Sequence, residues 1–153
     1  MRTKHIIEIL RKISFFEGLD DRTLEFIASV GEGVNVKAGD VLFQEGAAGD
    51  SVYLIIKGKI EVYKTDQDGY RSVLATLGTA DILGEMALLD ESPRSASAQA
   101  VEDSILISLK RMEFQLFLQS NFAVVLKLLS TLSRKLRDVN DKLTERNRRG
   151  YFP

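Results

Sequence analysis

The sequence predicts a mainly β domain, either a sandwich, a barrel or a jelly roll, flanked by helices at both ends. Two observations lead to this fold class. Through about residues 33–110 apolar residues alternate with polar ones, and turn residues interrupt them at short intervals, as in all-β folds built from many short strands. In residues 1–31 and 111–149 apolar residues recur at every third or fourth position instead, which is the spacing of helices.

Length and composition are those of one globular domain, residues 1–153. The chain has 153 residues, is 44% hydrophobic and carries a formal charge of -1, so it has enough apolar material for one core and no general attraction to nucleic acid or anionic membranes. It contains no cysteine, which excludes disulfides, cysteine zinc sites and thiol nucleophiles. We therefore expect a cytoplasmic protein with neither a membrane partner nor a nucleic-acid partner within this chain.

The N-terminal zone, residues 1–31, is expected to hold two helices. The first keeps its apolar residues at helical spacing until the pattern breaks at residues 14–19. The second starts after Asp20 or Asp21, either of which can cap free helix N–H groups, and it ends before Gly31.

The central zone, residues 33–110, shows four clear alternating strands at about residues 52–56, 60–63, 73–77 and 105–109. Between the second and third of them lies Asp-Gln-Asp-Gly at residues 66–69. This segment lacks the spacing and the downstream glutamate of a calcium-binding loop. It is therefore predicted to be the turn of a β-hairpin.

The C-terminal zone, residues 111–149, contains a long helix with a regular apolar seam. Its members alternate spacings of three and four: Phe122, Val125, Leu129, Leu132, Leu136, Val139 and Leu143. These residues either cover the roll within one chain or form a parallel two-fold homodimer, and the regularity favours the dimer. Arg134, Lys135 and Arg137 are expected on a solvated face, although Lys135 has no acidic partner across such a seam.

Residues 84–96 interrupt the strand pattern and have the parts of a phosphate site. Gly84 allows close approach of the backbone, and the turn of helix that follows offers free N–H groups. The guanidinium of Arg94 can hold two phosphate oxygens, with the hydroxyl of Ser95 beside it. The carboxylate of Glu85 accepts hydrogen bonds, so it suits a sugar hydroxyl. The alternative is a surface salt bridge between Arg94 and a nearby carboxylate.

This segment resembles the phosphate-binding cassette of the cyclic-nucleotide-binding domain family, whose members include the bacterial catabolite activator protein. The family pattern is Gly-Glu-(Leu/Met)-Ala-Leu, a variable loop, and Arg-(Ala/Ser/Thr)-Ala, which residues 84–88 and 94–96 satisfy. Residues 38–46 are similar to the family's glycine-rich turn, and residues 51–62 to its central hairpin. The sequence departs from many relatives at residues 80–83, where an aromatic residue and a glycine are missing.

The resemblance implies an eight-stranded jelly roll (double-stranded β-helix) and a cyclic nucleotide ligand, with cyclic AMP favoured over cyclic GMP. Arg94 would pair with the phosphate, Glu85 with the ribose 2′-hydroxyl, and Asn140 with the base, from its own subunit or a partner. The implied ligand-binding residues are Gly84, Glu85, Met86, Ala87, Arg94, Ser95, Ala96, Val139 and Asn140. No catalytic residue, metal or further cofactor is implied.

The expected function is therefore that of a non-enzymatic sensor that signals through its C-terminal helix to another protein. Two alternatives remain open. The chain can be the sensing half of a transcription regulator whose DNA-binding domain is not within these residues. It can also be a degenerate family member that forms a dimer and binds no nucleotide.

Overall fold

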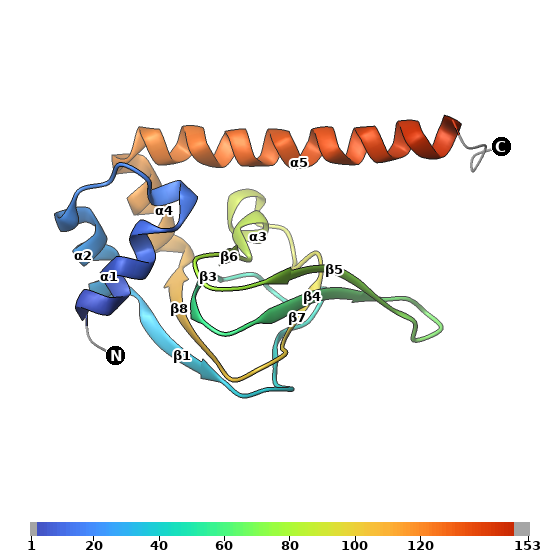
Figure 1. Ribbon diagram of the computed structural model, residues 1–153, viewed down its shortest axis with the longest axis horizontal. Coiled ribbons are helices and arrows are strands. Elements are labelled where there is room, and N and C mark those ends of the chain that lie inside the picture. Colours follow the sequence, from blue (N-terminus) through green and yellow to red (C-terminus); the bar gives the residue numbers. More distant parts are fainter. Residues whose placement is uncertain (1–2, 149–153) are drawn as a thin grey trace.

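The computed structural model describes residues 3–148, apart from the side chains of residues 15 and 86–88, and consists of a β domain with helices at both ends (Figure 1). The N-terminal zone contains helix α1 (Thr3–Arg11), the 3₁₀ turn η1 (Ser14–Phe16) and helix α2 (Asp21–Val30). The carboxylate of Asp20 caps α2 by accepting from the Thr23 N–H at 2.9 Å, and Gly31 follows its end. The second predicted N-terminal helix is therefore confirmed as α2, with Asp20 before its start and Gly31 after its end.

Eight strands form two four-stranded sheets in which every pair is antiparallel. One sheet has the order β1-β8-β3-β6 and the other the order β2-β7-β4-β5. The strands are β1 (Glu32–Val36), β2 (Val41–Phe43), β3 (Ser51–Lys57), β4 (Ile60–Thr65), β5 (Arg71–Leu77), β6 (Ile82–Leu83), β7 (Ser97–Ala100) and β8 (Ser104–Lys110). The four strands predicted from alternation are β3, β4, β5 and β8.

The turn between β4 and β5 is the predicted hairpin. The carboxylate of Asp66 accepts hydrogen bonds from the N–H groups of Asp68 and Tyr70, at 2.9 and 2.8 Å. Gly69 adopts a φ of 84°, a left-handed conformation that glycine takes without steric cost.

The apolar core is divided by the sheet that contains β3 and β8. One cluster lies between the two sheets and includes Ile55, Ile60 and Leu106, each fully buried. The other lies on the outer face of β3 and β8, where the helices pack, and includes an edge-to-face pair of Phe16 and Phe117 with ring centroids 5.3 Å apart. Strand β3 is buried on both faces, which explains its nearly continuous apolar sequence.

Helices α3 (Glu85–Asp90), α4 (Arg111–Ser120) and α5 (Phe122–Arg148) complete the described structure. Helices α4 and α5 meet at Asn121 with a bend of 110°, and the Asn121 amide donates to the Phe117 carbonyl at 2.8 Å. Helix α5 then extends along the molecule on the side where α3 lies (Figure 1). Within residues 3–148, no single helix is long and apolar enough to span a membrane, although the bent pair α4 and α5 meets these criteria when taken together.

The predicted seam of α5 is only partly covered in this chain. Leu132 packs against the helical core cluster, whereas Leu129, Leu136, Val139 and Leu143 are exposed. The most deeply buried residues of the helix are instead Val124 and Leu128, which the seam did not include. Helix α5 therefore has one apolar face on the domain and a second one open to solvent.

Candidate functional site

Gly84 gives the site its shape. It precedes α3 with a φ of 86° and a ψ of 12°, a left-handed conformation that other residues adopt at a cost. A Cβ atom at this position would also clash with Nη1 of Arg94. Glycine is therefore required here both by the backbone and by the neighbouring guanidinium.

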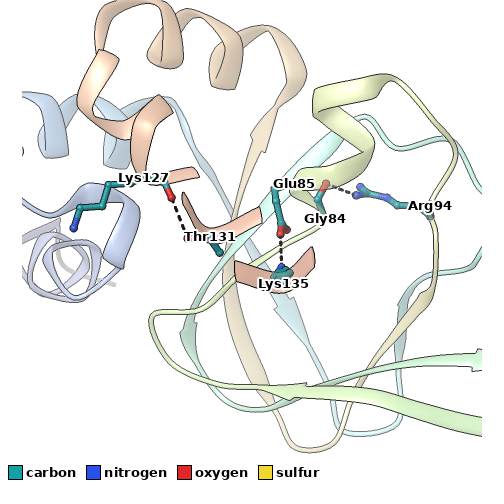
Figure 2. Close-up of polar contacts among 6 residues, drawn as sticks. All are labelled: Gly84, Glu85, Arg94, Lys127, Thr131 and Lys135. Atoms are coloured by element: carbon teal, nitrogen blue, oxygen red, sulfur yellow. Dashed lines mark hydrogen bonds and ion pairs between the residues drawn. The ribbon is translucent and has the colours of Figure 1, made fainter. Parts of the chain in front are cut away.

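Arg94 is almost completely buried, with 4% of its surface exposed. Its Nη2 donates to the Ser51 carbonyl at 2.7 Å. Its Nη1 donates to the Gly84 carbonyl at 3.1 Å (Figure 2). The guanidinium carbon lies 4.2 Å from the ring centroid of Phe43, within range of a cation–π contact. Its Nε is buried and has no partner in the described structure, so the side chain keeps unused donor capacity.

The charge of Arg94 is not neutralised by a neighbouring carboxylate. Among the residues that the structure describes, no carboxylate oxygen lies within 4.0 Å of the guanidinium in an ion pair, and both of its hydrogen bonds go to neutral carbonyls. Burial lowers the pKa of Arg94, because desolvation disfavours the charged form. The surface salt bridge considered from the sequence is thus wrong for this side chain.

Arg94 and Glu85 both face a cavity of about 240 Å³. Its remaining wall is mostly apolar and comes from both sheets, from the cassette and from α5. The lining residues are Phe43, Val62, Ala75, Leu77, Ile82, Leu83, Gly84, Glu85, Arg94, Ser95, Ala96 and Lys135. A concave apolar site with a few convergent charged groups is typical of small-molecule binding.

Glu85 lies at the start of α3 and is only 6% exposed. Its Oε1 accepts from the ammonium of Lys135 on α5 at 3.1 Å (Figure 2). Lys135 was expected on a solvated helix face, and its side chain is indeed 57% exposed, but its ammonium also reaches the cavity that Glu85 lines. One feature of the sequence pointed to this contact: Lys135 has no acidic partner along the seam.

The other predicted site residues divide into three groups. Ser95 and Ala96 line the cavity. The side chains of Met86 and Ala87 lie outside the described part of the structure, while their backbone belongs to α3. Val139 and Asn140 are exposed and do not line the cavity of their own chain, so their contact with a ligand in a partner subunit stays a prediction.

Sequence reasoning did not anticipate several groups that shape the site. The Ser51 carbonyl, the Phe43 ring and the apolar side chains of Val62, Ala75 and Leu77 all come from strands or strand ends. At residue 80, where the sequence departs from its relatives, Ala80 adopts a φ of 72°, a conformation that disfavours a side chain. Within the described chain, no group of three or more histidine, cysteine or acidic residues is arranged to hold a metal ion.

Comparison with known proteins agrees with this geometry. Residues 33–121 match the family described as the cyclic nucleotide-binding domain, and the match includes the whole cassette. The chain belongs to this family. The cyclic nucleotide-binding domain thus covers β1 almost from its start through α4, and α5 follows it.

Among its relatives, the domain is 34% identical to the cyclic AMP receptor protein of Thermus thermophilus over 128 residues, 84% of this chain and 59% of the relative. It is 28% identical to a CRP-like cAMP-activated global transcriptional regulator of Mycobacterium tuberculosis over 138 residues, 90% of this chain and 62% of the relative. The chain therefore spans about three fifths of these relatives.

A solved structure shows the same architecture. The crystal structure of the Thermus thermophilus catabolite activator protein superimposes with a TM-score of 0.80 at 34% identity, over 86% of this chain and 62% of that one. All of the cavity's lining residues except Lys135 lie within residues 33–121, the part of the chain that matches the family.

Proposed function

We propose that this cyclic nucleotide-binding domain is a sensor whose cavity binds a cyclic nucleotide, with cyclic AMP favoured over cyclic GMP. One observation carries the proposal: Arg94 is 4% exposed, has no carboxylate partner in the described structure, and lines a cavity beside Glu85. Buried charges are normally paired. The singly charged phosphate of a cyclic nucleotide supplies that pair.

The arrangement of the cavity suits the rest of such a ligand. Arg94 and the N–H groups at the start of α3 would hold the phosphate, and Glu85 would accept a hydrogen bond from a ribose hydroxyl. The side chains of Val62, Ala75 and Leu77 offer an apolar surface to the base. We interpret the two antiparallel sheets around it as the jelly roll expected from the sequence, and the names of the two relatives support cyclic AMP as the ligand.

We infer that the bound state is signalled through the C-terminal helices. The cassette touches the start of α4 through Arg111, whose Nη1 lies 3.7 Å from a carboxylate oxygen of Glu91 and whose Nη2 donates to the Gly49 carbonyl at 2.6 Å. It touches α5 through Glu85 and Lys135. The exposed apolar face of α5 supports a homodimer as the unit that responds.

The second candidate is the sensing part of a transcription regulator, with the DNA-binding part beyond these residues. It is favoured by the name of the Mycobacterium tuberculosis relative and by the share of about three fifths of both relatives' lengths that the chain spans. Such a regulator would work in the cytoplasm. A binding module without catalysis is common to both candidates, and the intact pair of Arg94 and Glu85 speaks against a degenerate member.

Calorimetric titration with cyclic AMP, cyclic GMP and linear 5′-AMP tests the proposal. We expect the wild type to bind a cyclic nucleotide and Arg94→Ala to lose about 2–5 kcal/mol of binding free energy, the range for truncating one partner of a buried charge pair. Arg71→Ala is the matched control, because Arg71 pairs with Glu61 and stacks on Tyr63 away from the cavity. Equal binding by the wild type and Arg94→Ala would refute the role of the cavity.

A further inference from the structure

Phe43 places an aromatic ring against the buried positive charge of the cavity. It is the last residue of β2, is partly buried and lines the cavity together with Arg94. The guanidinium carbon of Arg94 lies 4.2 Å from the centroid of this ring and 5.8 Å from that of Tyr53. The two rings stack on each other, with centroids 6.1 Å apart and planes 26° apart. The cation therefore lies within the range of cation–π attraction of two stacked rings.

A second arginine makes the same kind of ring contact in a different electrostatic setting. The guanidinium carbon of Arg71 lies 3.5 Å from the ring centroid of Tyr63. Arg71 is also paired with Glu61 at 2.6 Å, and 39% of its side chain is exposed. Arg94 is 4% exposed and has no carboxylate partner among the residues that the structure describes. The negative face of the Phe43 ring contacts its charge where Arg71 has an anion.

The segment that begins with Phe43 also fixes the rest of Arg94. The Gly46 N–H donates to the Arg94 carbonyl at 2.9 Å, and the Arg94 N–H donates to the Ala47 carbonyl at 2.8 Å. The Ser51 carbonyl accepts from Nη2 at 2.7 Å. One stretch of chain thus holds the backbone, the end of the side chain and the guanidinium of this residue. A group that is held in place beforehand loses little freedom when it binds a ligand.

We propose that Phe43 is a positioning residue for phosphate recognition, whose ring holds the guanidinium of Arg94 in place and stabilises its charge without neutralising it. The inference rests on the proposed function, since it needs the phosphate of a cyclic nucleotide beside Arg94. A carboxylate in the place of the ring would take up both the charge and the N–H donors of the guanidinium. The ring attracts the cation and leaves its charge available to an anionic ligand.

Binding measurements on Phe43→Leu test this role. Leucine keeps an apolar side chain at the end of β2 and removes the ring. We expect the affinity for cyclic AMP to fall about tenfold, within the range that a cation–π contact contributes, and Phe43→Tyr to keep most of the affinity. Tyr63→Leu is the matched control, because it removes a ring from Arg71 outside the cavity. Equal affinities of the wild type and Phe43→Leu would contradict the proposal.

A fluorinated ring separates the electrostatic role of Phe43 from its bulk. Pentafluorophenylalanine at residue 43 nearly keeps the shape of the side chain but withdraws the negative charge from the ring face on which the cation–π attraction depends. The affinity for cyclic AMP should fall about as far as in Phe43→Leu. An affinity equal to that of the wild type would mean that the ring only fills space, and would overturn the proposal.

A comparison of two ligands separates a role at the phosphate from a contact with the base. Cyclic AMP and cyclic GMP share the cyclic phosphate and the ribose and differ in the base. If Phe43 acts through Arg94, Phe43→Leu should weaken the binding of both ligands by the same factor. A loss confined to one of them would show that the ring contacts the base, which would contradict the positioning role.

NMR of the guanidinium gives a readout that does not depend on affinity. The Nε of Arg94 is buried, so its N–H should exchange slowly with water, and the ring current of Phe43 should displace its signal. The signal is assigned by its loss in Arg94→Lys. Phe43→Tyr should keep the displacement, whereas Phe43→Leu should remove it and speed up the exchange. An unchanged signal in Phe43→Leu would refute the contact on which the proposal depends.

The outcomes distinguish this inference from the proposed function. Failure of the wild type to bind any cyclic nucleotide would refute the proposed function, and the role of Phe43 at the phosphate with it. Binding by the wild type together with unchanged affinity in Phe43→Leu would refute the positioning role alone. An equal loss of affinity in Phe43→Leu and Tyr63→Leu would likewise refute it, because the loss would then be a general effect of removing a ring from this sheet.

Discussion

One apolar seam runs through both halves of helix α5, but only the first half also has a second apolar face that packs on the domain. In the first half, Val124 is 2% and Leu128 4% exposed, and both belong to the core that the helices build on β3 and β8. In the second half, Leu136 is 62% and Val139 52% exposed. The difference teaches that periodic apolar residues define a face of a helix but do not say which surface covers that face.

The division falls where α5 passes the cavity. The bend of 110° at Asn121 turns the chain from α4 into α5, and only the first turns of α5 remain in contact with the core cluster. Lys135 lies at the change from partly covered to exposed positions. The docked half of α5, up to Leu132, thus belongs to the domain. The outer half, from residue 133 to residue 148, is exposed and can contact a second chain.

The largest effect is expected for truncation of the docked half. Leu128→Ala should lower the free energy of unfolding by about 2–5 kcal/mol, because it leaves a cavity in the core. Chemical denaturation measures this change, and Leu136→Ala is the matched control with a leucine on the same helix. Equal destabilisation of the isolated domain by the two substitutions would contradict the claim that only the first half of α5 packs on the core.

An intermediate effect is expected in the outer half, and it concerns association. If Leu136 and Val139 lie in a dimer interface, Leu136→Ala should weaken dimerisation by about 1–2 kcal/mol, as for residues of a well-packed interface. Sedimentation equilibrium over a range of concentrations measures this loss. A wild type that stays monomeric at all concentrations would contradict the homodimer and leave the exposed face for a different partner.

The smallest effect is expected from the exposed ion pair between Glu17 and Lys127, which joins the first half of α5 to the residue that follows η1. The hydrogen bond from Lys127 and its positive charge lower the pKa of Glu17 below the ordinary value of 4.5. A carboxyl whose pKa is lowered by folding stabilises the native state at higher pH, and this contribution is lost as the pH falls through the lowered value.

The pH dependence of thermal unfolding checks this pair. The melting temperature of the wild type should slightly exceed that of Lys127→Met above pH 4.5, the ordinary value for Glu17, and the difference should vanish in stronger acid. Added salt should reduce it as well, because both side chains are exposed. A difference that persists in acid would mean that the ammonium of Lys127 stabilises the fold through a group other than the Glu17 carboxylate.

Several parts of the molecule could be predicted because their causes are local. Alternation identified β3, β4, β5 and β8, and the N-cap of α2 follows from Asp20. The strands β2, β6 and β7 have only two to four residues, too few for a clear alternating pattern, so their pairing with neighbouring strands defines them. In the site, Gly84, Glu85 and Arg94 were recognised because they lie within one short segment.

By itself, the sequence determined the mainly β architecture, the flanking helices and the cassette, since alternation, capping and turn residues act between near neighbours in the chain. Only the tertiary structure decided that Arg94 rests on the Ser51 and Gly84 carbonyls, that Phe43 covers it, and that Lys135 reaches Glu85. The physical reason is distance along the chain: Ser51 and Lys135 lie 43 and 50 residues from their partners, and sheet packing and the bend before α5 bring them together.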